Sequence, residues 1–446
     1  MRALARQVER LLSDNRSTAE AGCQQADLGR EHLTPAALQD AQDGLRAQLL
    51  WVEGRLRKVQ GRAQRRDEML ARRYARKPAL KDLRKEHTAL LRRRERVLEA
   101  QRTVLRQIGD AHAWMALEQD PRILVPLFAE RKHRLPDGIG LAGPVDLARR
   151  AHASGKFLVI ENDLTRCLGI GDLTIVFAQG HSGPPLSVEV KTQSHGGNAM
   201  NVHLVTVHSG GAHTSLHDEI CRVLGLEDLA TGETPPDSAK QTEELVSRTE
   251  LLLAATEKSY PRLKGPSRHV WRRVGNVIAR GYAEGSCVDL IERGVIVFAS
   301  RATEGRLAPD TEAGLRDRFE EIGSPREYVQ LSSADFLKND AWSARVLPVA
   351  LWPNVPSVAR AALMSGDLLF ACVMRKSVWV DAMRAEGLEL IDSRGWELTG
   401  PAGSVHLDVI EVQKLALGVA FGGVSPQEIA GRIASSLRGG KEAGHP

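Results

Sequence analysis

The sequence predicts an α+β protein with three parts: a helical N-terminal arm, a central part built on short strands, and a mixed C-terminal domain. Residues 38–108 carry apolar side chains at alternating steps of three and four, which is the spacing of packed helices. From residue 156 onward, short β-branched runs bounded by glycine and proline predict strands. The 446 residues are enough for two or three domains of ordinary size.

The composition excludes several classes of protein. Hydrophobic residues make up 42% of the chain and charged residues 26%, which is unlike a disordered chain. No run of about 18 apolar residues occurs, so we expect no membrane-spanning helix and no membrane partner. The amphipathic N-terminus lacks the apolar core of a secretory signal, and the five cysteines form no CxxC pair. These features favour a cytoplasmic protein.

The N-terminal arm is expected to contain two long helices. Residues 1–35 predict a short helix with a polar tail, and residues 36–108 predict helices on either side of Pro78, because an interior proline interrupts a helix. The two helices form either an antiparallel hairpin or a kinked coiled coil, and a coiled coil would make a homo-oligomer. The expected seam of the first helix is Leu45, Leu49, Val52, Leu56, Val59, Ala63 and Leu70, with Arg66 as a polar member. That of the second helix is Leu80, Leu83, His87, Leu90, Val97, Val104 and Ile108, with Arg94 and Gln101 as polar members.

The basic charge of the protein is concentrated in this arm. Residues 41–108 hold 20 Arg or Lys and 8 Asp or Glu, whereas the whole chain has a net charge of only +5. The arm is therefore expected to face phosphates or an acidic partner. The alternative is a dimerisation coil whose arginines form a solvated face. Aromatic residues are only 4% of the chain, which argues against a stacking platform for single strands.

Two consecutive strands carry the most informative pattern. Residues 173–178 and 186–191 alternate apolar and polar side chains and are joined by a Gly- and Pro-containing hairpin turn. With an even-length turn, even-numbered residues of the first strand lie opposite odd-numbered residues of the second. Asp172, Glu189 and Lys191 then share one face, and the apolar residues share the other.

Such a trio has a defined chemical use. Two neighbouring carboxylates repel each other unless a divalent cation lies between them, and Mg²⁺ prefers carboxylate oxygens and water as ligands. A cation held in this way can lower the pKa of a bound water and polarise a phosphoryl oxygen. A nearby lysine can orient the nucleophile or balance developing charge. The pattern therefore predicts metal-dependent phosphodiester hydrolysis with Mg²⁺ or Mn²⁺.

The segment resembles the PD-(D/E)xK, or restriction-endonuclease-like, nuclease superfamily over about residues 102–210. The resemblance rests on Gly171-Asp172 at a strand start, a hairpin, and Glu189-Val190-Lys191 in the next strand. It implies Asp172 and Glu189 as metal ligands, Lys191 as the catalytic lysine and Gln193 as a further active-site residue. The tripeptide alone is not specific, because Glu130-Arg131-Lys132 has the same form outside a strand.

The resemblance also implies an acidic residue from the preceding helix. Our first candidate is Glu118 and the second is Asp110, with Glu161 and Asp163 as further alternatives.

The sequence departs from the family after the second strand of the hairpin. The family core has a helix between its third and fourth strands, but residues 192–201 are too short and Gly-rich for a helix. Either residues 201–207 form an extra strand, or the fourth core strand comes later, at residues 295–299. In the first case the nuclease core spans residues 109–228 and a C-terminal α+β domain spans residues 241–446. In the second, residues 241–299 belong to the core.

The sequence of the C-terminal domain shows no recognisable group of catalytic or metal-binding residues. Strands are predicted at residues 295–299, 346–351, 368–373 and 405–412, and a helix at residues 268–283. Its expected roles are binding a protein partner, sensing the target or supporting the fold.

These observations predict a metal-dependent endonuclease acting on DNA, with regulated activity suited to antiviral defence or restriction. Two alternatives stay open: an RNase that uses the same site, and a non-catalytic coiled-coil protein that binds nucleic acid or serves as a scaffold.

Overall fold

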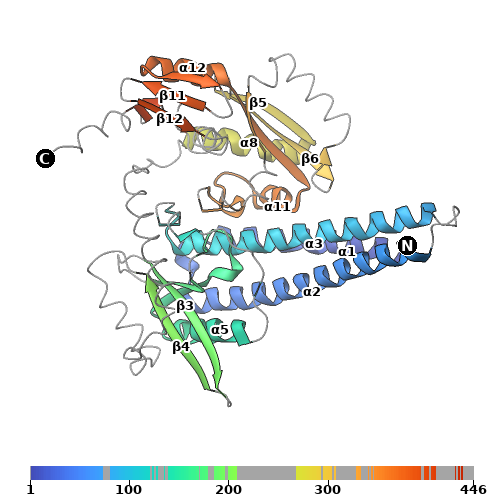
Figure 1. Ribbon diagram of the computed structural model, residues 1–446. Coiled ribbons are helices and arrows are strands. Elements are labelled where there is room, and N and C mark those ends of the chain that lie inside the picture. The colour runs from blue at the N-terminus through green and yellow to red at the C-terminus, as the bar shows by residue number, and fades with distance from the viewer. Residues whose placement is uncertain are drawn as a thin grey trace. The chain divides into compact units, whose positions relative to one another are not determined.

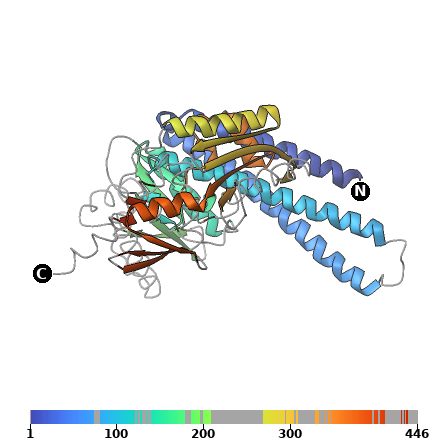
Figure 2. The same ribbon diagram turned by 90° about the horizontal axis from the view of Figure 1, so that it is seen from above.

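The computed structural model contains two compact units, which we describe separately (Figures 1 and 2). The first comprises residues 1–261 and 337–351, and the second comprises residues 262–336 and 352–446. The residues that the structure describes are 2–73, 81–120, 123–124, 127–128, 135, 139–169, 171–178, 185–195, 199–207, 268–292, 295–303, 306–307, 328–332, 340, 343–344, 346–392, 396–400, 403–407, 427, 430–431 and 433–434.

Three long helices begin the first unit: α1 (Arg2–Asp27), α2 (Pro35–Arg73) and α3 (Lys81–Ala116). The helix α3 packs against both α1 and α2, and α2 and α3 form an antiparallel hairpin (Figures 1 and 2). The expected short N-terminal helix is in fact 26 residues long. Most described members of the predicted seam are buried: Leu45, Leu49, Val52, Leu56, Val59, Arg94, Val97, Gln101, Val104 and Ile108. Ala63, His87 and Leu90 are only half-buried, and the side chains of Arg66, Leu70, Leu80 and Leu83 lie outside the described residues.

The seam is filled within a single chain. Because α3 also packs against α1, its buried stripe is wider than a two-helix seam and includes Leu98 and Leu105. The apolar spacing that predicted self-association is therefore satisfied without a second copy. The expected homo-oligomer stays a prediction.

A four-stranded antiparallel sheet follows, in the order β1-β2-β3-β4. Its strands are β1 (Phe157–Glu161), β2 (Leu173–Phe177), β3 (Leu186–His195) and β4 (Ala199–Val207). The helix α5 (Ile139–Ala153) contacts β1 and β3. Alternate residues of β1, β2 and β3 form one apolar cluster with Leu147, Ala148 and Ala151 of α5.

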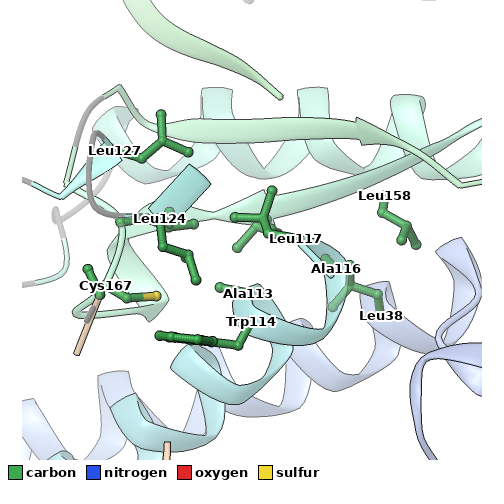
Figure 3. Close-up of a cluster of buried hydrophobic side chains, with 12 residues drawn as sticks. Leu38, Ala113, Trp114, Ala116, Leu117, Leu124, Leu127, Leu158 and Cys167 are labelled. Carbon is green, nitrogen blue, oxygen red and sulfur yellow. The ribbon is translucent and has the colours of Figure 1, made fainter. Parts of the chain in front are cut away.

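The opposite face of the sheet is also covered. Leu158 and Ile160 of β1 belong to a second apolar cluster with the end of α3, including Trp114 and Leu117. Figure 3 shows these side chains around Leu38, Leu124 and Cys167. The sheet is therefore fixed between α5 on one face and the long helices on the other.

The free edge of β1 is capped by side chains from two helices. Gln42 of α2 donates from Nε2 to the carbonyl of Val159 at 2.8 Å and accepts the N–H of Glu161 at 2.7 Å. His152 of α5 accepts the N–H of Val159 on Nε2 at 2.7 Å. Backbone groups that would otherwise stay open on an edge strand thus find partners within the chain.

The second unit contains two further antiparallel sheets. One has the order β5-β6-β9-β8, with β7 paired to β6, and the other has the order β10-β11-β12. Its elements are α8 (Arg268–Glu284), β5 (Ser286–Glu292), β6 (Val295–Thr303), β7 (Arg306–Leu307), β8 (Tyr328–Ser332), α11 (Ser357–Ser365), β9 (Leu368–Arg375), α12 (Lys376–Ala385), β10 (Glu389–Asp392), β11 (Trp396–Gly400) and β12 (Gly403–Leu407). The predicted α+β class is confirmed.

Several sequence predictions for individual elements can be compared with the structure. The helix near 268–283 and the strands at 295–299 and 368–373 are confirmed as α8, β6 and β9. Residues 295–299 pair with β5 and β9, so in the described structure they do not extend the β1–β4 sheet. The strand predicted at 346–351 is wrong, because residues 349–351 form a 3-10 helix.

The helix α5 was not predicted. Gly140, Gly143 and Pro144, residue types that disfavour a helix, all lie inside it. Within the part of the chain that the structure describes, no helix is long and apolar enough to cross a membrane.

Candidate active site

The register of β2 and β3 is the one that the sequence predicted. Leu173 lies opposite Val188 and Ile175 lies opposite Leu186, so even-numbered positions of β2 face odd-numbered positions of β3. The side chains of these residues and of Val190 belong to the apolar cluster under α5. The predicted apolar face of the hairpin is therefore confirmed. Continuing the same register by one residue places Asp172 opposite position 189.

Asp172 is held directly against the backbone of β3. Its N–H donates to the carbonyl of Val188 at 2.7 Å, and its carboxylate Oδ2 accepts the N–H of Val190 at 2.7 Å. The carboxylate thus bonds to the peptide group that links Glu189 to Val190, one residue before Lys191. Asp172 is partly exposed.

A glycine is required immediately before this aspartate. Gly171 has a φ of +69°, and a Cβ at this position would lie 2.8 Å from the carbonyl oxygen of Val188. Only glycine accepts both the left-handed backbone and the close approach without strain. This turn brings the backbone close to β3, so that Asp172 can hydrogen-bond to that strand.

A buried asparagine fixes the turn from the other side. The backbone N–H of Asn162 donates to the carbonyl of Asp172 at 2.9 Å, and its Nδ2 donates to the carbonyl of Gly171 at 3.2 Å. Its Oδ1 accepts the hydroxyl of Thr174 at 2.9 Å. Asn162 is a residue that the sequence analysis missed. Its position directly after the β1 strand was the available signal.

The loop from Asn162 to Leu168 is in turn anchored to α3. Asp110 is fully buried and accepts the backbone N–H groups of Arg166 at 2.6 Å and Cys167 at 2.9 Å, together with Nε of Arg166 at 2.9 Å. Arg106 donates to the carbonyls of Asp163 and Thr165. The position of Asp172 therefore depends on contacts that begin in the helical arm.

The remaining predicted residues of β3 are placed by the backbone. Glu189 pairs with Val205, Lys191 with His203 and Gln193 with Asn201 in the β3–β4 register. Positions 189, 191 and 193 alternate with the buried Val188 and Val190, so they belong to the other face of the strand. The side chains at these positions lie outside the described residues.

The candidates for the upstream acid have different surroundings. Glu118 follows the end of α3 in a left-handed conformation, with a φ of +60°, and forms an ion pair of 2.5 Å with Arg30. Its side chain is 66% exposed, so the pair is a surface contact. Asp110 has the buried anchoring contacts described above. Its oxygens already accept three hydrogen bonds, which is a structural role.

Glu161 is also engaged in a buried pair. Both of its carboxylate oxygens accept hydrogen bonds from Arg46 of α2, and both side chains are at least nine-tenths buried. Burial raises the pKa of Glu161, although the Arg46 guanidinium opposes this shift. The pair ties β1 to α2. A carboxylate neutralised by arginine in this way is poorly suited to hold a divalent cation.

Carboxylates such as those of Asp172 and Glu189 are suitable ligands for a hard divalent cation. An ionised carboxylate offers about four acceptor positions, so the bond to the Val190 N–H does not prevent Asp172 from ligating a metal. Glu189 would contribute a second set of carboxylate oxygens, which Mg²⁺ and Mn²⁺ accept. Among the described residues, no group of three or more His, Cys, Asp or Glu side chains is arranged to hold a metal.

Two buried histidines of the first unit, His112 and His152, are neutral near pH 7. Burial lowers the pKa of His112 to about 4 and that of His152 to about 4. His112 lies in α3, and its Nδ1 has no hydrogen-bond partner in the part of the chain that the structure describes. Burial also raises the pKa of the Cys167 thiol well above its usual range, with the nearby Asp110 adding to the shift. These groups are therefore uncharged components of the core.

Comparison with protein-family models, curated proteins and solved structures finds no match for this chain.

Proposed function

We propose that the protein hydrolyses phosphodiester bonds in DNA, using Mg²⁺ or Mn²⁺ held by Asp172 and Glu189. The observation that carries the proposal is the hydrogen bond from the Val190 N–H to Oδ2 of Asp172. It brings a carboxylate from the start of β2 to the segment of β3 that contains Glu189 and Lys191. The proposal agrees with the resemblance to PD-(D/E)xK nucleases noted from the sequence.

Each residue would have a separate task. A bound cation would lower the pKa of a water molecule and neutralise charge on the phosphate. Asp172 is held in a fixed orientation by Val188, Val190 and Asn162, so little reorganisation is needed to ligate the cation. Lys191 would orient the attacking water or balance the charge of the transition state. Gln193, two positions further along the same strand face, would contact the substrate.

The resemblance to the family covers only part of its core. The segment α5-β1-β2-β3 supplies a helix followed by three antiparallel strands. The next strand, β4, pairs directly with β3, where the family has an intervening helix.

Glu118 stays our proposed candidate for the acidic residue that the family supplies from the helix before the strands. The regulated role in defence, and a protein partner of the C-terminal unit, also stay predictions.

The decisive experiment is a cleavage assay on plasmid DNA, single-stranded DNA and RNA with Mg²⁺, Mn²⁺ or EDTA. We expect plasmid cleavage that requires a divalent cation and is lost in the Asp172→Asn, Glu189→Gln and Lys191→Ala variants. The matched control is Asp146→Asn, because Asp146 is an aspartate of the same unit that forms an exposed i,i+4 ion pair with Arg150 on the surface of α5. A second control is Lys132→Ala, from the other Glu-x-Lys tripeptide.

Two outcomes would contradict the proposal. Cation-dependent cleavage that persists in Asp172→Asn would place the chemistry elsewhere. Absence of cleavage on every substrate, with intact nucleic-acid binding, would favour the non-catalytic scaffold. Cleavage of RNA alone, lost in the same variants, would identify an RNase.

A further inference from the structure

One buried arginine of the helical arm differs in its surroundings from other buried arginines of the first unit. Arg46, Arg106 and Arg166 each have a carboxylate within 4 Å, from Glu161, Glu53 and Asp110 respectively. Arg94 of α3 is only 7% exposed, and its Nε has no hydrogen-bond partner among the described residues. Within the same part of the chain, the charged groups that act on it are two further cations, Arg55 and Arg62 of α2.

The two neighbouring arginines lie on one exposed stripe of α2. Arg55 and Arg62 are seven residues apart, which corresponds to two helical turns, or about 10 Å. Both side chains are exposed, as are Lys58 and Arg65 on the same side of the helix. The guanidinium of Arg55 lies over the ring of Trp51, 5.1 Å from its centroid, and this contact orients it.

This arrangement is unfavourable in the absence of an anion. Burial disfavours a charged group that has no partner of opposite sign, and two nearby cations add repulsion. Both effects lower the pKa of Arg94. A bound anion would offset the repulsion between the guanidinium groups and supply the missing counter-charge.

We propose that Arg55, Arg62 and Arg94 form a binding site for a phosphate group of the DNA backbone. The three guanidinium groups come from both helices of the hairpin, and arginine suits bidentate phosphate contact. The site lies on an open helix surface in line with further basic residues, which fits an extended polyanion better than a small enclosed ligand. The choice of DNA rests on the proposed function.

The test measures binding to a labelled DNA duplex in EDTA by fluorescence anisotropy, over a range of salt concentrations. EDTA removes the cation on which cleavage depends, so binding is followed alone. We expect Arg94→Met and Arg62→Met each to reduce the slope of log K against log salt by about 0.9. The matched control is Arg96→Met, since Arg96 is exposed on α3 and lies about 200° around the helix from Arg94.

A thermal melt separates binding from a structural role. Replacing Arg94 by Met removes an unpaired buried charge and keeps an apolar stem, so the melting temperature should stay the same or rise. A lower melting temperature with an unchanged salt slope would mean that Arg94 supports the fold only, and the inference would be wrong. Equal slope changes for Arg94→Met and Arg96→Met would also overturn it, because general charge would then explain binding.

Inorganic phosphate distinguishes a free ion from DNA. The melting temperature is measured in phosphate and in KCl at equal ionic strength, for the wild type and for Arg94→Met. If phosphate stabilises only the wild type, while duplex binding is the same for both proteins, the occupant is a free phosphate and the DNA site is refuted. Failure of the proposed function would look different. Asp172→Asn should bind the duplex as the wild type does, whether or not the protein cleaves DNA.

Discussion

Removal of the Asp110 carboxylate tests how the arm supports the candidate site. In Asp110→Ala, two backbone N–H groups and Nε of Arg166 lose the fully buried carboxylate that accepts their hydrogen bonds. Removing one partner of a buried ion pair costs about 3–5 kcal/mol. With a urea m-value of about 1–3 kcal/mol per molar, the unfolding midpoint of the first unit should fall by at least about 1 M.

Urea titration followed by tryptophan fluorescence provides the assay, because Trp114 is buried four residues from Asp110 and donates to the carbonyl of Ser343 at 2.8 Å. Asp146→Ala is the control, since its exposed i,i+4 pair with Arg150 is worth about 0.3–0.5 kcal/mol at most. We also expect Asp110→Ala to slow any cleavage, because the loop that it anchors leads to Asp172. Equal midpoints for the two variants would refute the view that Asp110 holds this loop in place.

Two further predictions concern a backbone turn and a buried histidine. Gly171→Ala should destabilise the protein and reduce cleavage more than Gly155→Ala in thermal melts and plasmid assays. Both glycines have φ near +70°, but a Cβ at Gly155 meets no atom within 4 Å; equal effects would show that the contact with Val188 is unimportant. For His112, the pKa of about 4 in the folded state lies below the unfolded value of about 6.5, so its stabilising contribution is complete above pH 6.5 and declines as the pH falls toward 4. His112→Leu should remove about 3 kcal/mol of this acid sensitivity in urea titrations between pH 7 and 4, and an unchanged pH profile would contradict the assignment.

The alternation of the β2–β3 hairpin could be predicted from sequence because it depends on local spacing. Leu173, Ile175, Leu186 and Val188 repeat every second residue, and a strand has no other way to bury such a pattern on one face. The helix seam was predictable for the same reason. In both cases the spacing of apolar residues along the chain predicted which face of the element is buried.

The support of the site could not be predicted in this way. Asp110 and Arg166 are 56 residues apart, and neither has a local pattern that identifies the other as its partner. The helix α5 was missed because Gly140, Gly143 and Pro144 are locally unfavourable in a helix, whereas packing of Leu147, Ala148 and Ala151 on the sheet stabilises it. Tertiary packing thus outweighed local preference.

The arginines of α3 also required the structure. Arg92, Arg93 and Arg94 are adjacent in sequence but have different surroundings. Arg92 is exposed, Arg93 pairs with Glu9 of α1 at 3.2 Å, and Arg94 is buried beside α2. A charge count treats the three residues as equivalent. Changing all three together would therefore disturb helix packing as well as any contact with phosphate.

The capping of the β1 edge determines how this protein can be divided experimentally. Gln42 and Arg46 come from α2, so a chain shortened to begin after the helical hairpin would lose the Gln42 contacts of the Val159 carbonyl and the Glu161 N–H, together with the Arg46 guanidinium. The strand edge would then offer unpaired peptide groups to other molecules, and the carboxylate of Glu161 would lose its paired guanidinium. Such a fragment should aggregate. Complementation by a separate peptide covering α1, α2 and α3 would be the way to recover it in soluble form.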